Sequence, residues 1–309
     1  MKFHAALFLS LLVLPAAAVF AGEPEPSPAD SATLFEQARA LLGRDDAKAL
    51  ALMEQASASG SADATGGLGY FYAKGIAVPK DEAKAAAYFK KGAEGGSPRA
   101  QLNYAVVLLA GQGVAKDAPA AVPWLEKSAA AAVPEAQERL GLALFHGDII
   151  EGIGRDHERA RSLLAAAAEA GLPAAQNAYG QMWASALGGP GDEKAAEDWY
   201  GRAAGQGDPK AMSNLGRLLF NSGAKDRSRR VEGLKWLLVA EALDEITAKN
   251  ALNEYKFNLD GSEWAEAKQA ADRMSYRMRF KAGLAKVRAS QPAGSATSPQ
   301  SSPTPADAE

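Results

Sequence analysis

The stretch Ala136-Gln-Glu-Arg-Leu140-Gly141 decides the fold, because close copies of it recur along the chain. The other copies are Ala64-Thr-Gly-Gly-Leu68-Gly69, Ala100-Gln-Leu-Asn-Tyr104-Ala105, Ala175-Gln-Asn-Ala-Tyr179-Gly180 and Ala211-Met-Ser-Asn-Leu215-Gly216. We call the first residue of each copy the marker alanine. Successive marker alanines lie 36, 36, 39 and 36 residues apart. A period in this range is typical of a solenoid of stacked helical units.

Each period is long enough for two helices. In the first, the small residue five positions after the marker lets the paired helix approach closely. A glycine follows eleven positions after the marker in three units, at Gly75, Gly111 and Gly147, which predicts a left-handed cap at the end of the first helix. Bulky side chains then recur 24 to 27 positions after the marker, where we expect the core of the second helix: Tyr88, Trp124, Leu163, Trp199 and Trp236.

Prolines mark the junctions between units. Each of them precedes a marker alanine by two residues: Pro98, Pro134, Pro173 and Pro209. Proline suits the first turn of a helix, where its missing N–H is not needed. Ser97 and Asp208, each directly before one of these prolines, are predicted helix N-caps.

The single interval of 39 residues indicates a three-residue insertion. Gly147 keeps its place relative to Ala136, whereas Leu163 comes three residues late. The extra residues therefore belong to the loop between the two helices, Gly147 to Asp156. Insertions in solenoids map to loops, because the stacked core keeps its register.

The ends of the chain differ from the repeats. We expect a divergent capping helix pair over 31–60 (Thr33 to Leu42 and Ala47 to Ser59), five repeats over 61–247 and C-terminal capping helices over 248–288. Ser262 is the expected N-cap of the last helix. The segment 22–30 has the composition of a stiff proline-rich linker, and 289–309 that of a disordered tail.

Residues 1–21 have the pattern of an export signal. Lys2 precedes an apolar run, Ala5 to Leu14, and Val19-Phe20-Ala21 forms a cleavage site; cleavage after Ala18 is the alternative, and so is an uncleaved anchor. No later stretch is long and apolar enough to span a membrane. We therefore expect a bacterial protein that is periplasmic or secreted, and not an integral membrane protein once processed.

The repeat unit resembles the Sel-one-like repeat family, relatives of the tetratricopeptide repeats. The best match runs from Ala64 to Gly95 and includes Asp81-Glu-Ala-Lys84-Ala85. The resemblance implies an all-α fold, a right-handed α-solenoid of stacked antiparallel helix pairs whose first helices line a concave groove. It also implies an adaptor that binds other proteins.

If that geometry holds, polar residues of the first helices face the groove. They could pair with the main chain or a charged terminus of an extended peptide; the alternative is an ordinary solvated face. These candidate groove contacts are Asp63, Arg99, Asn103, Glu135, Glu138, Asn177, Gln181, Lys210, Asn214, Arg217 and Asn250.

The sequence contains few signals for disulfides, nucleic-acid binding, metal binding or catalysis. The absence of cysteine excludes disulfides and thiolate sites, and a net charge of −3 gives no sign of nucleic-acid binding. His146 and His157 flank the insertion with Asp148, Glu151 and Asp156 between them, but nothing fixes a metal geometry. Ser222-Gly-Ala-Lys225 fits the Ser-x-x-Lys pattern of penicillin-recognising enzymes, without the companion Lys-Thr/Ser-Gly.

The sequence thus predicts an exported, non-enzymatic adaptor with no cofactor and with a protein or peptide partner. The alternative is a cell-wall-associated protein that binds or acts on peptidoglycan or β-lactams.

Overall fold

The computed structural model describes residues 28–147, 149–256 and 260–290, with side chains described from Asp30 to Tyr276 within those ranges. In this part of the chain every regular element is an α-helix. The helices are α1 (Pro28–Leu41), α2 (Asp46–Ala58), α3 (Ala62–Lys74), α4 (Glu82–Glu94), α5 (Pro98–Ala110), α6 (Ala118–Ala130), α7 (Pro134–His146), α8 (His157–Glu169), α9 (Pro173–Ala184), α10 (Glu193–Gly205), α11 (Pro209–Ser222), α12 (Arg227–Glu241), α13 (Ile246–Tyr255) and α14 (Gly261–Ser290). The expected signal segment lies outside the described residues.

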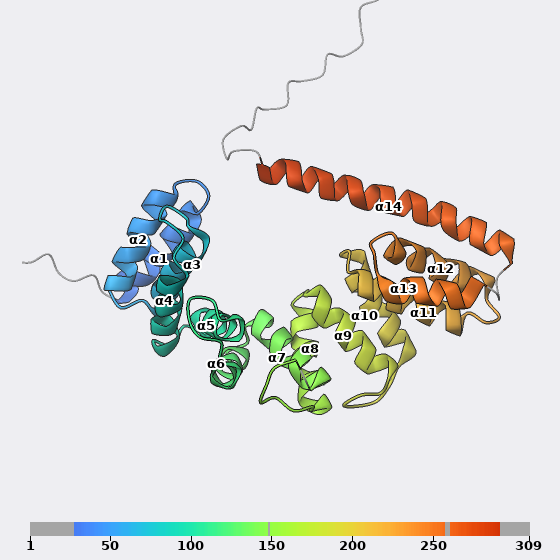
Figure 1. The fold of residues 1–309 in the computed structure, drawn as a ribbon, viewed down its shortest axis with the longest axis horizontal. Coiled ribbons are helices and arrows are strands. Elements are labelled where there is room, and N and C mark those ends of the chain that lie inside the picture. The colour runs from blue at the N-terminus through green and yellow to red at the C-terminus, as the bar shows by residue number, and fades with distance from the viewer. Residues whose placement is uncertain (1–27, 148, 257–259, 291–309) are drawn as a thin grey trace, which may run out of the picture.

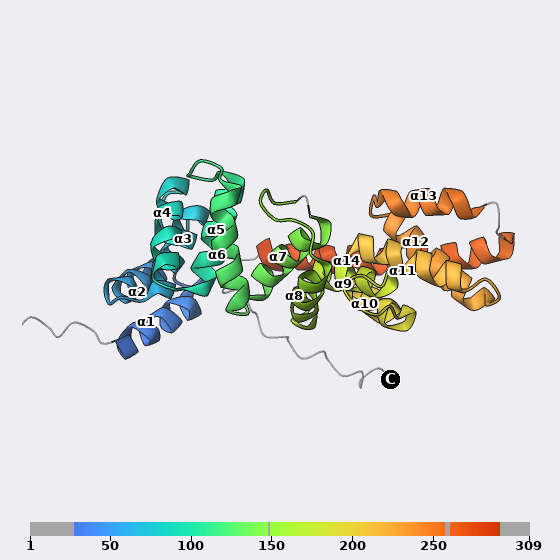
Figure 2. The same cartoon turned by 90° about the horizontal axis from the view of Figure 1, so that it is seen from below.

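Consecutive helices pack as pairs, and each pair packs on the next. The pairs follow one another along an open arc, and α14 runs along its open side (Figure 1). Figure 2 shows the same succession of pairs along the long axis of the molecule. The predicted all-α solenoid is therefore confirmed. In the described part, none of the helices combines the length and the apolar character that a membrane crossing needs.

The small residue after each marker alanine lets the two helices of a repeat touch. A Cβ atom added at Gly69 would lie 2.6 Å from the ring of Phe89, and one added at Gly141 would lie 2.8 Å from Leu164. Real Cβ atoms do not come this close to another atom. Glycine is therefore needed for close packing at these two positions.

The most deeply buried position of the second helix lies one residue after the predicted one. Phe89, Leu125 and Leu164 are at most 4% exposed, whereas the bulky residues directly before two of them, Tyr88 and Trp124, are half-buried. The half-buried rings instead pack on aromatic rings of the first helix. One such pair is Tyr72 and Tyr88 (5.5 Å between ring centroids), and Tyr104 with Trp124 (5.7 Å) is another.

The predicted helix ends are largely confirmed. The four junction prolines begin α5, α7, α9 and α11, and the side chains of Ser97 and Asp208 accept hydrogen bonds from the amides of the marker alanines that follow them. Gly75, Gly111 and Gly147 cap α3, α5 and α7 with left-handed backbone.

Three boundaries differ from the expectation. Helix α1 begins at Pro28, inside the segment expected to be a linker. This start is possible because proline is tolerated in the first helical turn. Helix α14 begins at Gly261, and Asp260 rather than Ser262 supplies the capping carboxylate, which accepts a hydrogen bond from the Ser262 amide at 3.0 Å. This bond lowers the pKa of Asp260. The C-terminal helix also extends to Ser290, beyond the expected limit.

The structure confirms that the insertion is confined to the loop before α8. In three other repeats the amide of the residue that caps the second helix bonds to a carbonyl nine residues earlier: Asp81 bonds to Tyr72, Asp117 to Leu108 and Asp192 to Trp183. Asp156 makes the same bond to Leu144, twelve residues earlier. The three extra residues are therefore taken up between the same two helix ends.

Polar contacts hold the first part of α14 against α12. Glu263 is buried and pairs with Arg230, and the guanidinium of Arg227 lies 2.7 Å from the carboxylate of Glu266. Ala267 and Ala271 are buried on the same side of α14.

Replacing a core residue by a charge tests the register of the array. Leu140 is 3% exposed in the central core. We expect Leu140→Asp to destabilise the protein by roughly 3 kcal/mol or more, because a buried carboxylate there has no partner. Thermal melting followed by circular dichroism measures this loss. Ser162→Asp, at an exposed position of α8, is the matched control, and equal melting of the two variants would contradict the packing described above.

Candidate functional site

Most of the candidate groove residues lie on one stripe of the first helices. The stripe consists of the residue before each marker alanine and the residues three and six positions after the marker. Spacings of four and three residues place side chains on one face of a helix. We call these positions the first-helix stripe. Eight of the predicted contacts belong to it: Asp63, Arg99, Asn103, Glu135, Gln181, Lys210, Asn214 and Arg217.

Glu138 and Asn177 face the next repeat instead. Both lie two residues after a marker alanine. The Glu138 carboxylate accepts a hydrogen bond from the amide of Ala175 at 3.2 Å, and the Asn177 side-chain oxygen accepts one from Asn214 at 2.9 Å. The residue before α9, Leu172, gives no side-chain cap, so Glu138 supplies the missing acceptor. These two residues therefore join repeats.

A hollow opens on the stripe near the N-terminal end of the array. We call it the N-terminal hollow; its volume is about 370 Å³. Helices α1, α3 and α5 supply most of its walls. The lining residues are Phe35, Arg39, Leu42, Met53, Asp63, Gly66, Gly67, Tyr70, Phe71, Ser97, Arg99, Ala100 and Asn103. Three predicted groove residues, Asp63, Arg99 and Asn103, thus meet at one place.

The hollow combines an apolar floor with polar groups at its edge. Met53 and Phe71 are buried beneath it, and Tyr70 is 43% exposed. Gly67 lets the Met53 side chain pack against α3, because a Cβ atom there would lie 2.7 Å from the sulfur of Met53. The site can therefore receive an apolar side chain.

The charged groups around the hollow differ in how freely they can bind. Asp63 accepts a hydrogen bond from the hydroxyl of Ser97, whose oxygen accepts one from the amide of Ala100. Arg39 is paired with Glu36 at 3.0 Å. By contrast, within the described residues Arg99 forms no ion pair or side-chain hydrogen bond, and it is exposed. Arg99 is thus the cation that is available to a ligand.

The other predicted contacts are spread along the array. Lys210, Arg217 and Asn250 are exposed. Gln181 is half-buried, as is Glu135. The Glu135 oxygen Oε2 is buried and, in the part of the chain that the structure describes, has no hydrogen-bond partner.

Sequence reasoning missed Arg39 and Tyr70. The repeat spacing contains a signal for both. Tyr70 follows Asp63 by seven residues and therefore lies on the same helix face. Phe35 and Arg39 of α1, together with Leu42 in the turn directly after it, show the same spacings of four and three residues. The marker alanine is absent from α1, which hides the correspondence.

Burial affects the ionisation of Glu138. Burial raises the pKa of its carboxyl above the ordinary value of 4.5, and the hydrogen bond from Ala175 opposes this shift. Its half-buried position between two repeats therefore disfavours the charged form.

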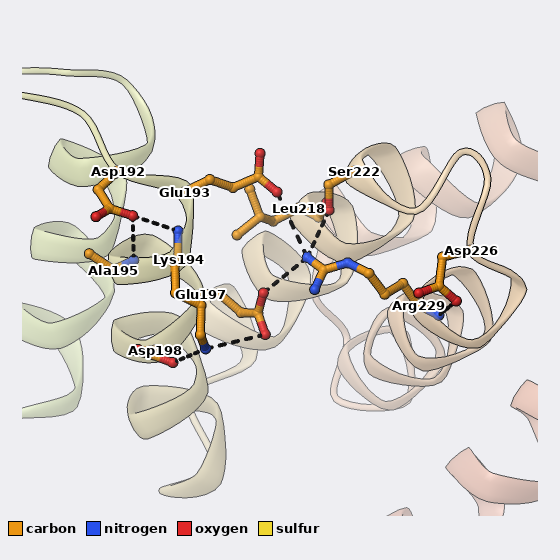
Figure 3. A network of polar contacts seen from close by, with 10 residues as sticks. All are labelled: Asp192, Glu193, Lys194, Ala195, Glu197, Asp198, Leu218, Ser222, Asp226 and Arg229. Carbon is orange, nitrogen blue, oxygen red and sulfur yellow. Dashed lines mark hydrogen bonds and ion pairs between the residues drawn. The ribbon is translucent and has the colours of Figure 1, made fainter.

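Ser222 does not have the surroundings of a nucleophile. It is the last residue of α11 rather than a loop residue. Its hydroxyl donates to the carbonyl of Leu218 and accepts from the guanidinium of Arg229, each at 2.9 Å. Figure 3 shows that Arg229 also reaches the carboxylates of Glu193 and Glu197. A permanent cation cannot remove the proton of a hydroxyl, so Arg229 cannot act as a base for Ser222. The network instead links α10, α11 and α12.

The two histidines next to the insertion pack on one ring. His146 and His157 have ring centroids 4.7 Å and 5.9 Å from that of Phe145. Among the described residues there is no cluster of three or more potential metal ligands. Asp148, one of the residues considered for such a site, lies outside them.

A comparison with protein families identifies the repeat. The model of the Sel1 repeat matches six consecutive segments, residues 34–61, 62–97, 98–133, 134–172, 173–208 and 209–244. The chain belongs to the Sel1 repeat family. The first matched Sel1 repeat coincides with the helix pair α1–α2, which the sequence analysis treats as a divergent cap. The fourth contains the inserted loop.

Comparison with solved structures finds chains similar to this one. A Sel1 repeat protein from Oxalobacter formigenes is 26% identical and covers 80% of this chain and 99% of its own, with a TM-score of 0.59. A protective antigen present in uropathogenic Escherichia coli strains is 19% identical and covers 90% of this chain and 74% of its own, with a TM-score of 0.37. No curated protein matches the chain.

The contact of Glu138 with α9 predicts a pH-dependent effect on stability. A carboxyl whose folded pKa is raised contributes stability below the unfolded pKa, and this contribution is lost as the pH rises through the folded pKa. Glutamine keeps an acceptor for Ala175 but does not titrate. We therefore expect the melting temperature of Glu138→Gln, relative to wild type, to increase from about pH 4 to about pH 7.

The matched variant Glu138→Ala removes the acceptor altogether. We expect it to lower stability by about 1 kcal/mol, as loss of an N-cap does, at both ends of the pH range. A glutamine variant whose relative melting temperature falls with pH would show that the pKa of Glu138 is not raised.

Proposed function

We propose that this Sel1 repeat protein is an exported, non-enzymatic adaptor that binds an extended segment of a partner protein along the first-helix stripe. Sel1 repeats generally serve as scaffolds for protein–protein interaction, and Sel1 repeat proteins are typically non-catalytic. The N-terminal hollow is the anchor point of the proposed site.

The observation that carries the proposal is the coincidence of an apolar hollow and an unpaired cation. A volume of about 370 Å³ accommodates one large apolar side chain of a bound peptide. Arg99 at the edge can donate to a carboxylate, and the Asn103 side chain can both donate to and accept from a peptide main chain. Apolar anchors with a few polar groups around them are typical of peptide-binding sites.

The non-enzymatic part of the proposal depends on the surroundings of Ser222. Its hydroxyl is bonded to Arg229 and to a main-chain carbonyl. Within the described residues Lys225 forms no hydrogen bond with it. A Ser-x-x-Lys nucleophile requires a neighbouring base, and the adjacent cation is Arg229 instead.

Charge reversal at the hollow tests the proposed site. We expect Arg99→Glu to reduce binding of a captured partner about tenfold or more, because an attractive contact becomes a repulsive one. The measurement is crosslinking in intact cells followed by affinity capture and by titration of the recovered protein. Lys91→Glu, an exposed residue of α4 outside the hollow, carries the same charge change and should bind as wild type.

Two outcomes would contradict the proposal. One is equal binding by the two variants, which would place the partner elsewhere on the molecule. The other is sedimentation of the purified protein with insoluble peptidoglycan when no protein partner is present, which would favour the cell-wall alternative.

Export is a separate part of the proposal and is supported by the pattern of residues 1–21. We expect N-terminal sequencing of the protein from a bacterial host to begin at Gly22, or at Val19 if cleavage follows Ala18. Recovery of the uncleaved chain from the cytoplasmic fraction would contradict export without bearing on the binding site.

A further inference from the structure

The inserted loop before α8 builds a second hollow, separate from the N-terminal hollow that anchors the proposed function. We call it the central hollow; its volume is about 510 Å³. It lies between α5 and α7, and the loop supplies one wall. The lining residues are Leu109, Lys116, Ala118, Arg139, Leu142, Ile149, Ile150 and Glu151. Arg139 and Leu142 belong to the first-helix stripe, so the hollow continues the surface described above.

The loop is anchored to the rest of the repeat at more than one point. Ile150 and Ile153 are buried in the central core, and the amide of Ile153 donates to the carbonyl of Ile150 at 3.1 Å. The guanidinium of Arg155 donates to the carbonyl of His146 at 2.8 Å. Yet Ile149, beside these anchors, is 57% exposed. A partner that covers this apolar side chain removes it from water, and this burial stabilises the complex.

Among the described residues that line the hollow, basic side chains outnumber acidic ones. Lys116 and Arg139 are exposed and, in the part of the chain that the structure describes, neither forms an ion pair or a side-chain hydrogen bond. Glu151 is the one carboxylate among the described lining residues. Two cations against one anion favour an acidic ligand.

We propose that the central hollow binds an acidic segment of a partner protein, in which an apolar side chain lies next to carboxylates. The apolar side chain packs on Leu142 and Ile149, and the carboxylates pair with Lys116 and Arg139. This adds a second binding site to the proposed function, which concerns protein partners. Its test below does not involve the N-terminal hollow.

The isoleucines of this chain allow a direct test. The sequence contains five, at positions 76, 149, 150, 153 and 246. Labelling their δ1-methyl groups therefore places three signals in the inserted loop and two outside it. The probe is a blocked heptapeptide, Gly-Ser-Asp-Leu-Asp-Ser-Gly, titrated to about millimolar concentration, where weak single-site contacts are detected. The comparison peptide carries lysine in place of both aspartates.

We expect the acidic peptide to shift the Ile149 methyl signal and to leave Ile76 and Ile246 unchanged. Arg139→Glu keeps all five reporters and should weaken the titration about tenfold or more, whereas Lys91→Glu should titrate as wild type. Equal shifts with the lysine peptide, unchanged affinity in Arg139→Glu, or no shift of Ile149 at the highest peptide concentration would each overturn the proposal. The effect of Arg99→Glu on partner binding tests the N-terminal hollow and thus the proposed function. It is independent of peptide binding at the central hollow.

Discussion

At the small residue five positions after each marker alanine, the first helix of a repeat lies directly against a buried side chain of the second. Gly69 against Phe89 and Gly141 against Leu164 show the contact, in which even a methyl group would overlap its neighbour. This close approach fixes the spacing of the two helices in a repeat. The direction of the first-helix stripe, and with it the position of both hollows, follows from that spacing.

Local polar contacts join one repeat to the next, in addition to the apolar core that the repeats share. Asp63 supports the serine that caps α5, Glu138 caps α9 in place of a side chain from Leu172, and Asn214 bonds to Asn177. Each bond joins a first helix to the first helix of the next repeat. A solenoid derives its stability from such nearest-neighbour terms, so the residues that border the binding surface also hold the repeats together.

Much of the fold follows from sequence because its signals are local. A proline at N1 and a glycine at a left-handed cap depend on one residue's own backbone. The structure confirms the helix starts predicted at the four prolines and the left-handed cap predicted at Gly147. The candidate site was harder to predict. Glu138 lies one residue from the stripe position of Arg139, and a rotation of one residue about a helix decides whether a side chain faces a ligand or the next repeat. Contacts across repeats settle that choice.

The closing bond of the inserted loop has a consequence for how such a protein changes over time. Asp156 returns to the carbonyl of Leu144 just as Asp81 returns to Tyr72, although the intervening chain is three residues longer. Loop length is therefore separated from the stacking of the helices. New surface groups such as Ile149 can be gained or lost by mutation in this loop while the helices remain in register. Recognition and foldability can thus evolve under different constraints within one repeat.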